Sequence, residues 1–358
     1  MLESGEVLPQ LNISYQTFGQ LNNDCSNVVW VFHALTGNAD PTEWWPEIVG
    51  KNQVIDPAKD FIVCANTLGS CYGSSGPASI NPDRAKKYGA DFPFISIRDM
   101  VQAHQVLQRH LGITKIQLGI GGSMGGQQLI EWAISDATLF ENICLLATNA
   151  QFSAWGIAFN ESQRMAIYAD LSNNSTTKNA GKQGLKAARS IAMLSYRTYQ
   201  TYGHSQQEYS DDIVANFKAS SYQQYQGEKF WNRFDVHAYL CLTKAMDSHN
   251  VGRKRGGVEQ AITRIKSRTL IIGIASDVLF PIQEQQLLFE HIPNAQLEII
   301  DSAYGHDGFL VEVEEISRLL QDFRANKAVS FSSKDTIRKL QKKSSMLNIV
   351  ALPGSETF

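Results

Sequence analysis

The 358-residue sequence predicts an α/β protein with a mostly parallel central sheet, helices on both faces and an inserted helical lid. Two observations predict this class. Continuous apolar runs such as 28–32 and 61–65 alternate with amphipathic helix patterns, which is typical of parallel strands covered on both faces. A glycine-flanked serine, Ser123, stands directly between a strand pattern and a helix pattern, as it does in a nucleophile elbow.

The first part of the predicted core follows this alternation. Residues 11–18 alternate as a half-buried strand does, and the runs at 28–32 and 61–65 are expected at the centre of the sheet. Apolar residues within 97–111 recur mainly at three- and four-residue steps, which predicts a helix. The sequence then predicts a strand over 115–120, a helix over 127–134 and a buried strand over 143–148.

The amino-acid composition changes between residues 151 and 265, which are rich in Gln, Asn, Ser, Tyr and Ala. We expect this block to be a helical lid over the carboxyl edge of the sheet, inserted between two parts of the core, 1–150 and 266–326. The serine-rich residues 327–358 are expected to form a loosely held tail. The predicted elements are lid helices over 157–169, 184–199, 211–226 and 236–246, and core strands over 269–274 and 297–300.

Composition excludes several classes of protein. A formal net charge of -3 gives no basic footprint for nucleic acid or an anionic membrane. The N-terminal residues lack the pattern of a signal peptide, and no segment is long and apolar enough to span a membrane, so a cytoplasmic location is expected. The five cysteines are odd in number and lack metal-ligand spacing, which predicts reduced packing thiols and no metal site.

Ser123 needs a general base and an acid that orients the base, because a serine hydroxyl alone is a poor nucleophile. On this scaffold the acid precedes the histidine in the chain. Asp277 and His306 each follow a predicted strand, and both should reach the sheet edge that carries Ser123. The sequence therefore predicts a catalytic triad of Ser123, His306 and Asp277.

The segment HALTG at 33–37 follows the strand at 28–32, where such scaffolds supply one oxyanion amide. The backbone amides of Leu35 and Met124 are the predicted donors, each worth about 3 to 4 kcal/mol. His33 has two open interpretations, as a residue that orients this loop or as a proton-transfer group. We favour the first, because His33 precedes Ser123 in the chain.

The chain resembles the homoserine O-acetyltransferases, a branch of the α/β-hydrolase superfamily, over nearly everything from residue 8 to about residue 323. In combination the matching motifs are highly specific. They are HALTG at 33–37, WWP at 44–46, NTLGSCYGSSGP at 66–77, DFP at 91–93, GGSMGG at 121–126, FNE at 159–161, FWNRFD at 230–235, SDVLFP at 276–281 and YGHDGFL at 304–310. The resemblance implies an α/β-hydrolase fold and the same three triad residues.

The resemblance also implies substrate-binding residues. Arg189 would bind the homoserine carboxylate, for which a forked guanidinium is well suited, and Tyr196 lies seven positions later. Asp307 would receive the homoserine ammonium. Each has a plainer interpretation, since a lone helical arginine is usually solvated and an aspartate often caps a turn. Met193 and the altered loop at 170–180 depart from the family pattern and affect the lid.

The implied reaction is a two-step transfer of an acetyl group from acetyl-CoA to L-homoserine, as part of methionine synthesis, with no bound cofactor. The resemblance further implies a homodimer formed through the lid helices. Alternatives are a serine acceptor, a succinyl donor and a carboxylester hydrolase that uses the same triad. The basic run 253–255 could meet coenzyme A phosphates, although we favour a solvated face, and the loop at 69–76 is expected to border the site.

Overall fold

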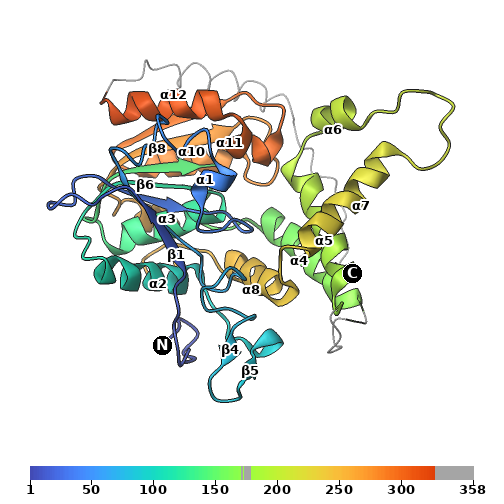
Figure 1. Ribbon diagram of the computed structural model, residues 1–358. Helices are drawn as coiled ribbons and strands as arrows, with labels where there is room; N and C mark the ends of the chain where they lie inside the picture. The colour runs from blue at the N-terminus through green and yellow to red at the C-terminus, as the bar shows by residue number, and fades with distance from the viewer. Residues whose placement is uncertain (171, 173–178, 327–358) are drawn as a thin grey trace, which may run out of the picture.

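Residues 1–170, 172 and 179–326 are described by a computed structural model of the protein (Figure 1). The central sheet has seven strands in the order β1-β3-β2-β6-β7-β8-β9, and only β1 pairs in the antiparallel sense. The predicted mostly parallel α/β fold is therefore confirmed. The strands are β1 (Tyr15–Phe18), β2 (Val28–Phe32), β3 (Phe61–Ala65), β6 (Ile116–Gly122), β7 (Phe140–Leu146), β8 (Arg268–Ile274) and β9 (Ala295–Ile300).

Helices cover both faces of the sheet (Figure 1). Every residue of the central strand β2 is therefore buried, and its alternate side chains enter different cores. Trp30 and Phe32 face one apolar cluster, whereas Val29 and Val31 face the other. The first cluster includes side chains of α2 (Ile97–His110), α3 (Met124–Ser135), α9 (Val258–Ile262) and α10 (Ile282–His291), and the second includes side chains of α11 (Gly308–Val311) and α12 (Val313–Arg324).

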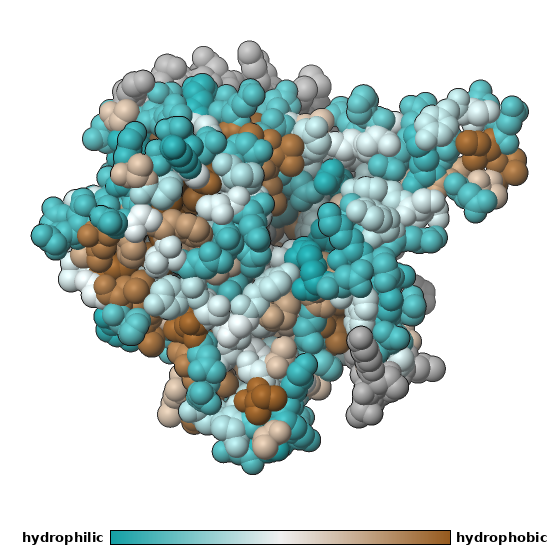
Figure 2. Space-filling model, viewed as in Figure 1, coloured by the Kyte–Doolittle hydropathy of each residue, from teal (hydrophilic) through white to brown (hydrophobic). Residues whose placement is uncertain are grey.

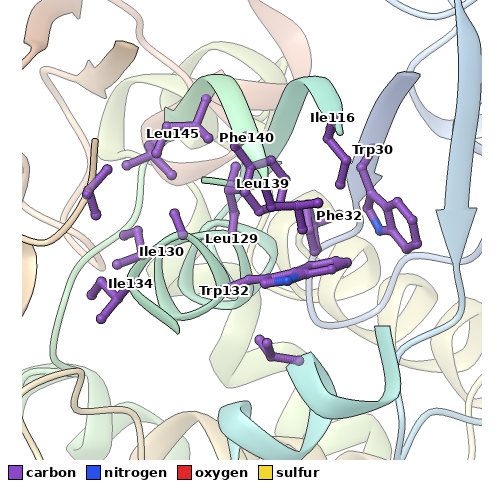
Figure 3. Packing of buried hydrophobic residues seen from close by; sticks show 14 of the residues in the cluster. Trp30, Phe32, Ile116, Leu129, Ile130, Trp132, Ile134, Leu139, Phe140 and Leu145 are labelled. Carbon is purple, nitrogen blue, oxygen red and sulfur yellow. The ribbon is translucent and has the colours of Figure 1, made fainter. Parts of the chain in front are cut away.

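The first cluster is centred on the Trp132 ring of α3 (Figure 3). This ring meets Trp30 and Phe140 edge to face, at centroid distances of 5.1 and 5.3 Å, and stacks on the His104 imidazole. Such pairs contribute about 0.5 to 1.5 kcal/mol each beyond the apolar area that they bury. The helix that begins directly after Ser123 is thus held firmly against the sheet.

The lid helices come between β7 and β8 in the chain; in Figure 1 α4 to α7 lie to the right of the sheet and α8 lies below it. Their buried side chains form a third cluster, which also contains Leu35 and Met124 of the core. Near the end of the 151–265 block, α9 instead packs in the first core cluster. The division into 1–150, 151–265 and 266–326 stays a prediction. The lid helices are α4 (Ala154–Ala169), α5 (Lys182–Tyr196), α6 (Tyr199–Gln206), α7 (Lys218–Trp231) and α8 (Val236–Asp247).

Two predicted lid helices are wrong in their bounds. The helix expected over 184–199 ends at Tyr196, because Thr198 begins α6 as its N-cap and accepts a hydrogen bond from the Thr201 amide. The helix expected over 211–226 begins only at residue 218, since residues 211–217 are mostly exposed and Asn216 has a left-handed φ of 58° that no helix contains. It extends to Trp231 because Phe230 is buried in the lid cluster. The strand expected over 11–18 is also shorter, with pairing only over Tyr15–Phe18.

Short elements complete the described chain: α1 (Pro41–Trp44), the β4–β5 hairpin (Ile80–Asn81 and Lys86–Lys87) and the 3₁₀ turns η1 (Gly89–Asp91) and η3 (Gly305–Asp307). None of the helices in the described ranges is long and apolar enough to cross a bilayer. Polar side chains dominate the face seen in Figure 2, and an apolar patch marks the outer tip of the lid, over the loop that joins α6 to α7. The predicted tail, 327–358, lies outside the described residues, as do 171 and 173–178 of the altered lid loop.

Candidate active site

Ser123 occupies a strained turn between β6 and α3, with φ 54° and ψ -126°. Close backbone approaches explain the flanking glycines, because a Cβ on Gly121 would lie 2.7 Å from the Gly125 oxygen. A Cβ on Gly125 would lie 2.3 Å from the Phe32 oxygen, so that turn must carry glycine where it passes the end of β2. The Ser123 amide donates to the Leu146 carbonyl at 3.0 Å, which ties the strained residue to the sheet.

The three predicted triad residues meet at the carboxyl edge of the sheet. The His306 Nε2 lies 3.0 Å from the Ser123 Oγ, and the His306 Nδ1 lies 2.6 Å from the Asp277 Oδ2. All three residues are buried. An imidazole held in this way can accept the serine proton at Nε2 while the carboxylate stabilises the imidazolium that forms.

The Asp277 carboxylate is oriented by the turn that follows β8. Its Oδ1 accepts hydrogen bonds from the amides of Leu279 and Phe280, at 2.8 and 2.9 Å, which leaves Oδ2 directed at His306. The Phe280 ring stacks on the imidazole with a centroid distance of 4.9 Å and an interplanar angle of 18°. Gly305 has φ 64°, a left-handed conformation that favours glycine, and this turn delivers His306.

The predicted oxyanion segment is a tight turn in which the Gly37 amide donates to the Ala34 carbonyl at 2.9 Å. The Thr67 amide donates to the His33 Nε2, so the imidazole proton is on Nδ1, which donates to the same carbonyl at 2.8 Å. Burial lowers the pKa of His33 to about 4, and the ring is neutral near pH 7. His33 therefore orients this loop, as expected.

Neither the Leu35 amide nor the Met124 amide donates to another group within the described part of the chain. Met124 is the first residue of α3, where the leading amides of a helix have no intrahelical acceptor. Both residues belong to the third apolar cluster, which the lid helices share with the core. The turn that carries Leu35 follows the end of β2, where Phe32 closely approaches Gly125 of the nucleophile turn. Their role as oxyanion donors stays a prediction.

A cavity of about 380 Å³ lies over the Ser123 hydroxyl and His306. It is lined by the predicted oxyanion turn, residues 34–37, by α5 and the residue after it, and by the segment 306–311. The half-buried Arg189 guanidinium lies over the rings of Phe230 and Tyr196, at 5.1 and 5.5 Å from their centroids. Burial raises the pKa of Tyr196, so its hydroxyl stays protonated near neutral pH and can donate a hydrogen bond.

Asp307 supplies the one carboxylate among the described residues that line this cavity, and it is already paired. The Arg197 Nε donates to its Oδ2 at 2.6 Å, and both side chains are partly exposed, 29% and 19% respectively. This contact depends on the break between α5 and α6, which the sequence interpretation missed. The spacing of Thr198 and Thr201 at an N-cap was the signal that could have revealed it.

Arg233 is a second cavity residue that the sequence interpretation missed. Its Nη1 donates to the Thr36 carbonyl at 2.8 Å and to the Tyr72 hydroxyl at 2.9 Å, and its Nη2 lies 3.3 Å from the Thr36 Oγ1. The guanidinium therefore connects the segment between α7 and α8 to the oxyanion turn. All three residues lie within quoted family motifs, but the motifs alone do not indicate that they meet.

Glu284 of α10 is the unusual acid near the triad. Burial is the main cause that raises its pKa to about 7, and the negative charge of Asp277 raises it further. Its carboxylate accepts a hydrogen bond at 2.8 Å from the Asn149 side chain, which in turn accepts one from Gln127 of α3. This acid is therefore partly protonated near pH 7.

The basic run at 253–255 is engaged within the protein. Arg253 pairs with Glu3 at 2.9 Å, and Arg255 pairs with the buried Glu131. The favoured expectation of a solvated face is thus wrong for these two arginines, because buried or partly buried carboxylates face them. The five cysteines carry no disulfide, and no cluster of potential metal ligands occurs in the described ranges.

The fold and these contacts define an α/β-hydrolase with a serine, histidine and aspartate arrangement, and a sequence model of the alpha/beta hydrolase fold matches residues 27–313. A homoserine O-acetyltransferase of Cyclobacterium marinum is 48% identical over 322 residues, which are 90% of this chain and 92% of that protein. The chain belongs to the homoserine O-acetyltransferase family, as its motifs predicted.

Solved structures agree with this assignment. The homoserine O-acetyltransferase from Staphylococcus aureus superposes with a TM-score of 0.76 at 30% identity, over 95% of this chain and 96% of that one. Esterase E22 superposes with a TM-score of 0.82 at 24% identity, over 90% and 96% of the two chains. At that identity the esterase shares the fold, and its likeness carries nothing about the acceptor of the acyl group.

Proposed function

We propose that the protein transfers the acetyl group of acetyl-CoA to the hydroxyl of L-homoserine through an acetyl ester on Ser123. The observation that carries this proposal is the content of a single cavity. It joins the Ser123 hydroxyl and the His306 imidazole to an arginine free of carboxylate partners in the described chain, Arg189, and to one carboxylate, Asp307. An α-amino acid presents the opposite pair of charges.

In the first half-reaction the Ser123 Oγ attacks the thioester carbonyl carbon while the His306 Nε2 takes the hydroxyl proton. The amides of Leu35 and Met124 bind the oxyanion of the tetrahedral intermediate. The carbon-sulfur bond then breaks, and the imidazolium gives its proton to the departing coenzyme A sulfur. Asp277 stays ionised and stabilises the imidazolium throughout.

In the second half-reaction the homoserine hydroxyl gives its proton to the His306 Nε2 as its oxygen attacks the acetyl carbon. The ester bond to Ser123 breaks, and the serine oxygen recovers the proton. Arg189 binds the carboxylate of the acceptor in a bidentate manner, and Asp307 binds its ammonium. Tyr196, whose ring centroid lies 5.8 Å from that of the His306 imidazole, donates a hydrogen bond to the acceptor. Lid side chains exclude water, which would otherwise hydrolyse the ester.

The same proposal includes a homodimer formed through the lid helices. Several large apolar side chains of the lid are exposed to solvent in the single chain, which supports an interface there. They include Leu194, Tyr199, Val214 and Tyr225, with exposed fractions of 57%, 92%, 89% and 60%. We also propose a cytoplasmic location, which suits five unpaired cysteines.

The test is the rate of thiol release from acetyl-CoA by the purified protein, with L-homoserine, L-serine or water alone as acceptor, repeated with succinyl-CoA. We expect fast release only with homoserine and acetyl-CoA. Release that is indifferent to the amino acid would instead identify a hydrolase, and preference for succinyl-CoA or serine would identify one of the other acyltransferases. The Ser123→Ala variant should lose turnover while keeping its thermal unfolding temperature.

A further inference from the structure

We infer that Arg233 is a positioning residue of the oxyanion hole, which it controls from the lid side through two peptide groups joined by a hydrogen bond. The inference rests on the acyl-serine chemistry proposed above. It begins from the hydrogen bond between the Arg233 Nη1 and the Thr36 carbonyl, at 2.8 Å, which the contact of Nη2 with the Thr36 hydroxyl oxygen supports.

The contact is directional because a peptide group is planar. The Thr36 carbonyl belongs to the same peptide as the Gly37 amide, so a donor fixed on the oxygen fixes the direction of the opposite N–H. That N–H donates to the Ala34 carbonyl at 2.9 Å. The Ala34 carbonyl in turn shares its peptide with the Leu35 amide, the proposed oxyanion donor. Arg233 therefore sets the direction of the Leu35 N–H two peptides away.

The chain of hydrogen bonds also has an electrical effect. A guanidinium on the first carbonyl polarises each peptide in turn and makes the last N–H a stronger donor. The second hydrogen bond to the Ala34 carbonyl comes from His33, which is neutral, so Arg233 is the charged end of the chain. The stronger Leu35 N–H stabilises the negative charge that develops on the substrate oxygen. It therefore stabilises the transition state more than the bound substrate.

The place of Arg233 couples this effect to the lid. The residue follows α7, and its guanidinium lies over the Phe230 ring of that helix at 5.2 Å. The Tyr72 hydroxyl accepts a third hydrogen bond from it. The segment between α7 and α8 thus supplies the charged donor that fixes the oxyanion turn.

The test uses the full protein and p-nitrophenyl acetate, a neutral ester that needs no amino-acid binding. We measure the pre-steady-state rate at which Ser123 is acetylated and p-nitrophenolate is released. Arg233→Met should lower this rate by about 10- to 100-fold, less than the loss of a whole oxyanion donor. Arg233→Lys, which keeps the charge and one donor, should recover most of the rate. The KM for homoserine should change less than threefold in both variants.

Arg268→Met is the matched control, because Arg268 also lies over a phenylalanine ring, that of Phe323, and donates to a backbone carbonyl, but far from the site at the start of β8. It should acetylate at the wild-type rate. If Arg233→Met does not fold, Arg233→Gln carries the same expectation of a loss of at least tenfold.

Two outcomes would overturn the inference. In the first, acetylation by the ester is unchanged while the KM for homoserine or acetyl-CoA rises, which would make Arg233 a substrate-binding residue. In the second, Arg233→Lys is as slow as Arg233→Met, which would remove the role of the charge. A wild-type protein that is not acetylated at Ser123 would instead refute the proposed function, so the two failures are distinguishable.

Discussion

The core side and the lid side of the site differ in how far the protein already satisfies its own polar groups. On the core side, Asp277 accepts three hydrogen bonds and the imidazole of His306 is bonded at both nitrogens. On the lid side, Arg189 faces aromatic rings, and Arg197 takes the carboxylate of Asp307 that the proposed substrate needs.

This difference separates chemistry from recognition. The triad is preorganised by turns at the ends of β6, β8 and β9, so it requires no rearrangement when a substrate arrives. The proposed acceptor site, in contrast, has to exchange the ion pair between Arg197 and Asp307 for contacts with the proposed substrate. Substitutions on the core side should therefore reduce turnover, whereas substitutions of Arg189 and Arg197, which face the proposed acceptor, should change its KM.

The largest effect is expected from Asp277→Asn. The Asn oxygen should keep the two amide hydrogen bonds that Oδ1 now accepts, which directs the NH₂ group at the His306 Nδ1. Two donors cannot face each other, so the imidazole must carry its proton on Nε2 and cannot accept the serine proton. We expect kcat to fall about 10⁴-fold with little change in KM. Steady-state kinetics measure the fall in kcat, and near-UV circular dichroism checks that the variant is folded. A fall in kcat of less than tenfold would contradict the prediction.

Arg189→Met tests the lid side. The variant keeps an apolar stem over the rings and removes the charged donors, so the KM for L-homoserine should rise about 50-fold. The sharper readout is the ratio of kcat/KM for homoserine to that for 2-amino-1,4-butanediol, which lacks the carboxylate. That ratio should collapse in the variant. A preserved ratio would show that Arg189 does not read the carboxylate.

Arg197→Met should have the opposite sign. Removing the internal partner frees Asp307 for the substrate ammonium, and a partly exposed ion pair is worth about 1 kcal/mol, so the KM for homoserine should fall about fivefold. Arg197→Lys, which can still pair, should stay close to wild type. A KM that rises in Arg197→Met would mean that the arginine holds the carboxylate in its binding position, and the lid side would then be as preorganised as the core.

The sequence was most informative about the core side. Apolar runs identified the buried strands because a strand covered on both faces has few polar residues, and the glycines at 121 and 125 marked the close approaches around Ser123. The confirmed fold follows from these local patterns, whereas the confirmed family was recognised by the resemblance of its motifs. The carboxyl ends of parallel strands share one edge, so residues after separate strands could be expected to meet.

The lid side was less predictable because its contacts join segments with no shared pattern. Arg197 reaches Asp307 only because α5 stops at Tyr196, and a capping residue decided that stop against a helical periodicity. Arg233 and Thr36 are 197 positions apart, and nothing local to either residue indicates the pair. Helix bounds failed for a related reason, since apolar residues before α7 such as Val214 and Phe217 are exposed and have no surface of the single chain to pack against.

Glu284→Gln tests the core side with the smallest effect on turnover, which we expect to stay within threefold. The pKa of Glu284 is raised to about 7 in the folded protein, so the folded state binds this proton more tightly than the unfolded state does. The wild type should therefore lose stability from this group as pH rises from about 4.5 to 7, and no more above that range. The glutamine keeps the oxygen that accepts from Asn149 and removes the charge. The free energy of unfolding of Glu284→Gln, relative to wild type, should thus increase by about 1 kcal/mol between pH 5 and pH 8, after allowance for partial solvation. Urea denaturation at the two pH values measures this difference.

If the difference in free energy of unfolding between Glu284→Gln and wild type is the same at pH 5 and pH 8, the carboxylate is solvated, and the protein tolerates a second full negative charge beside Asp277.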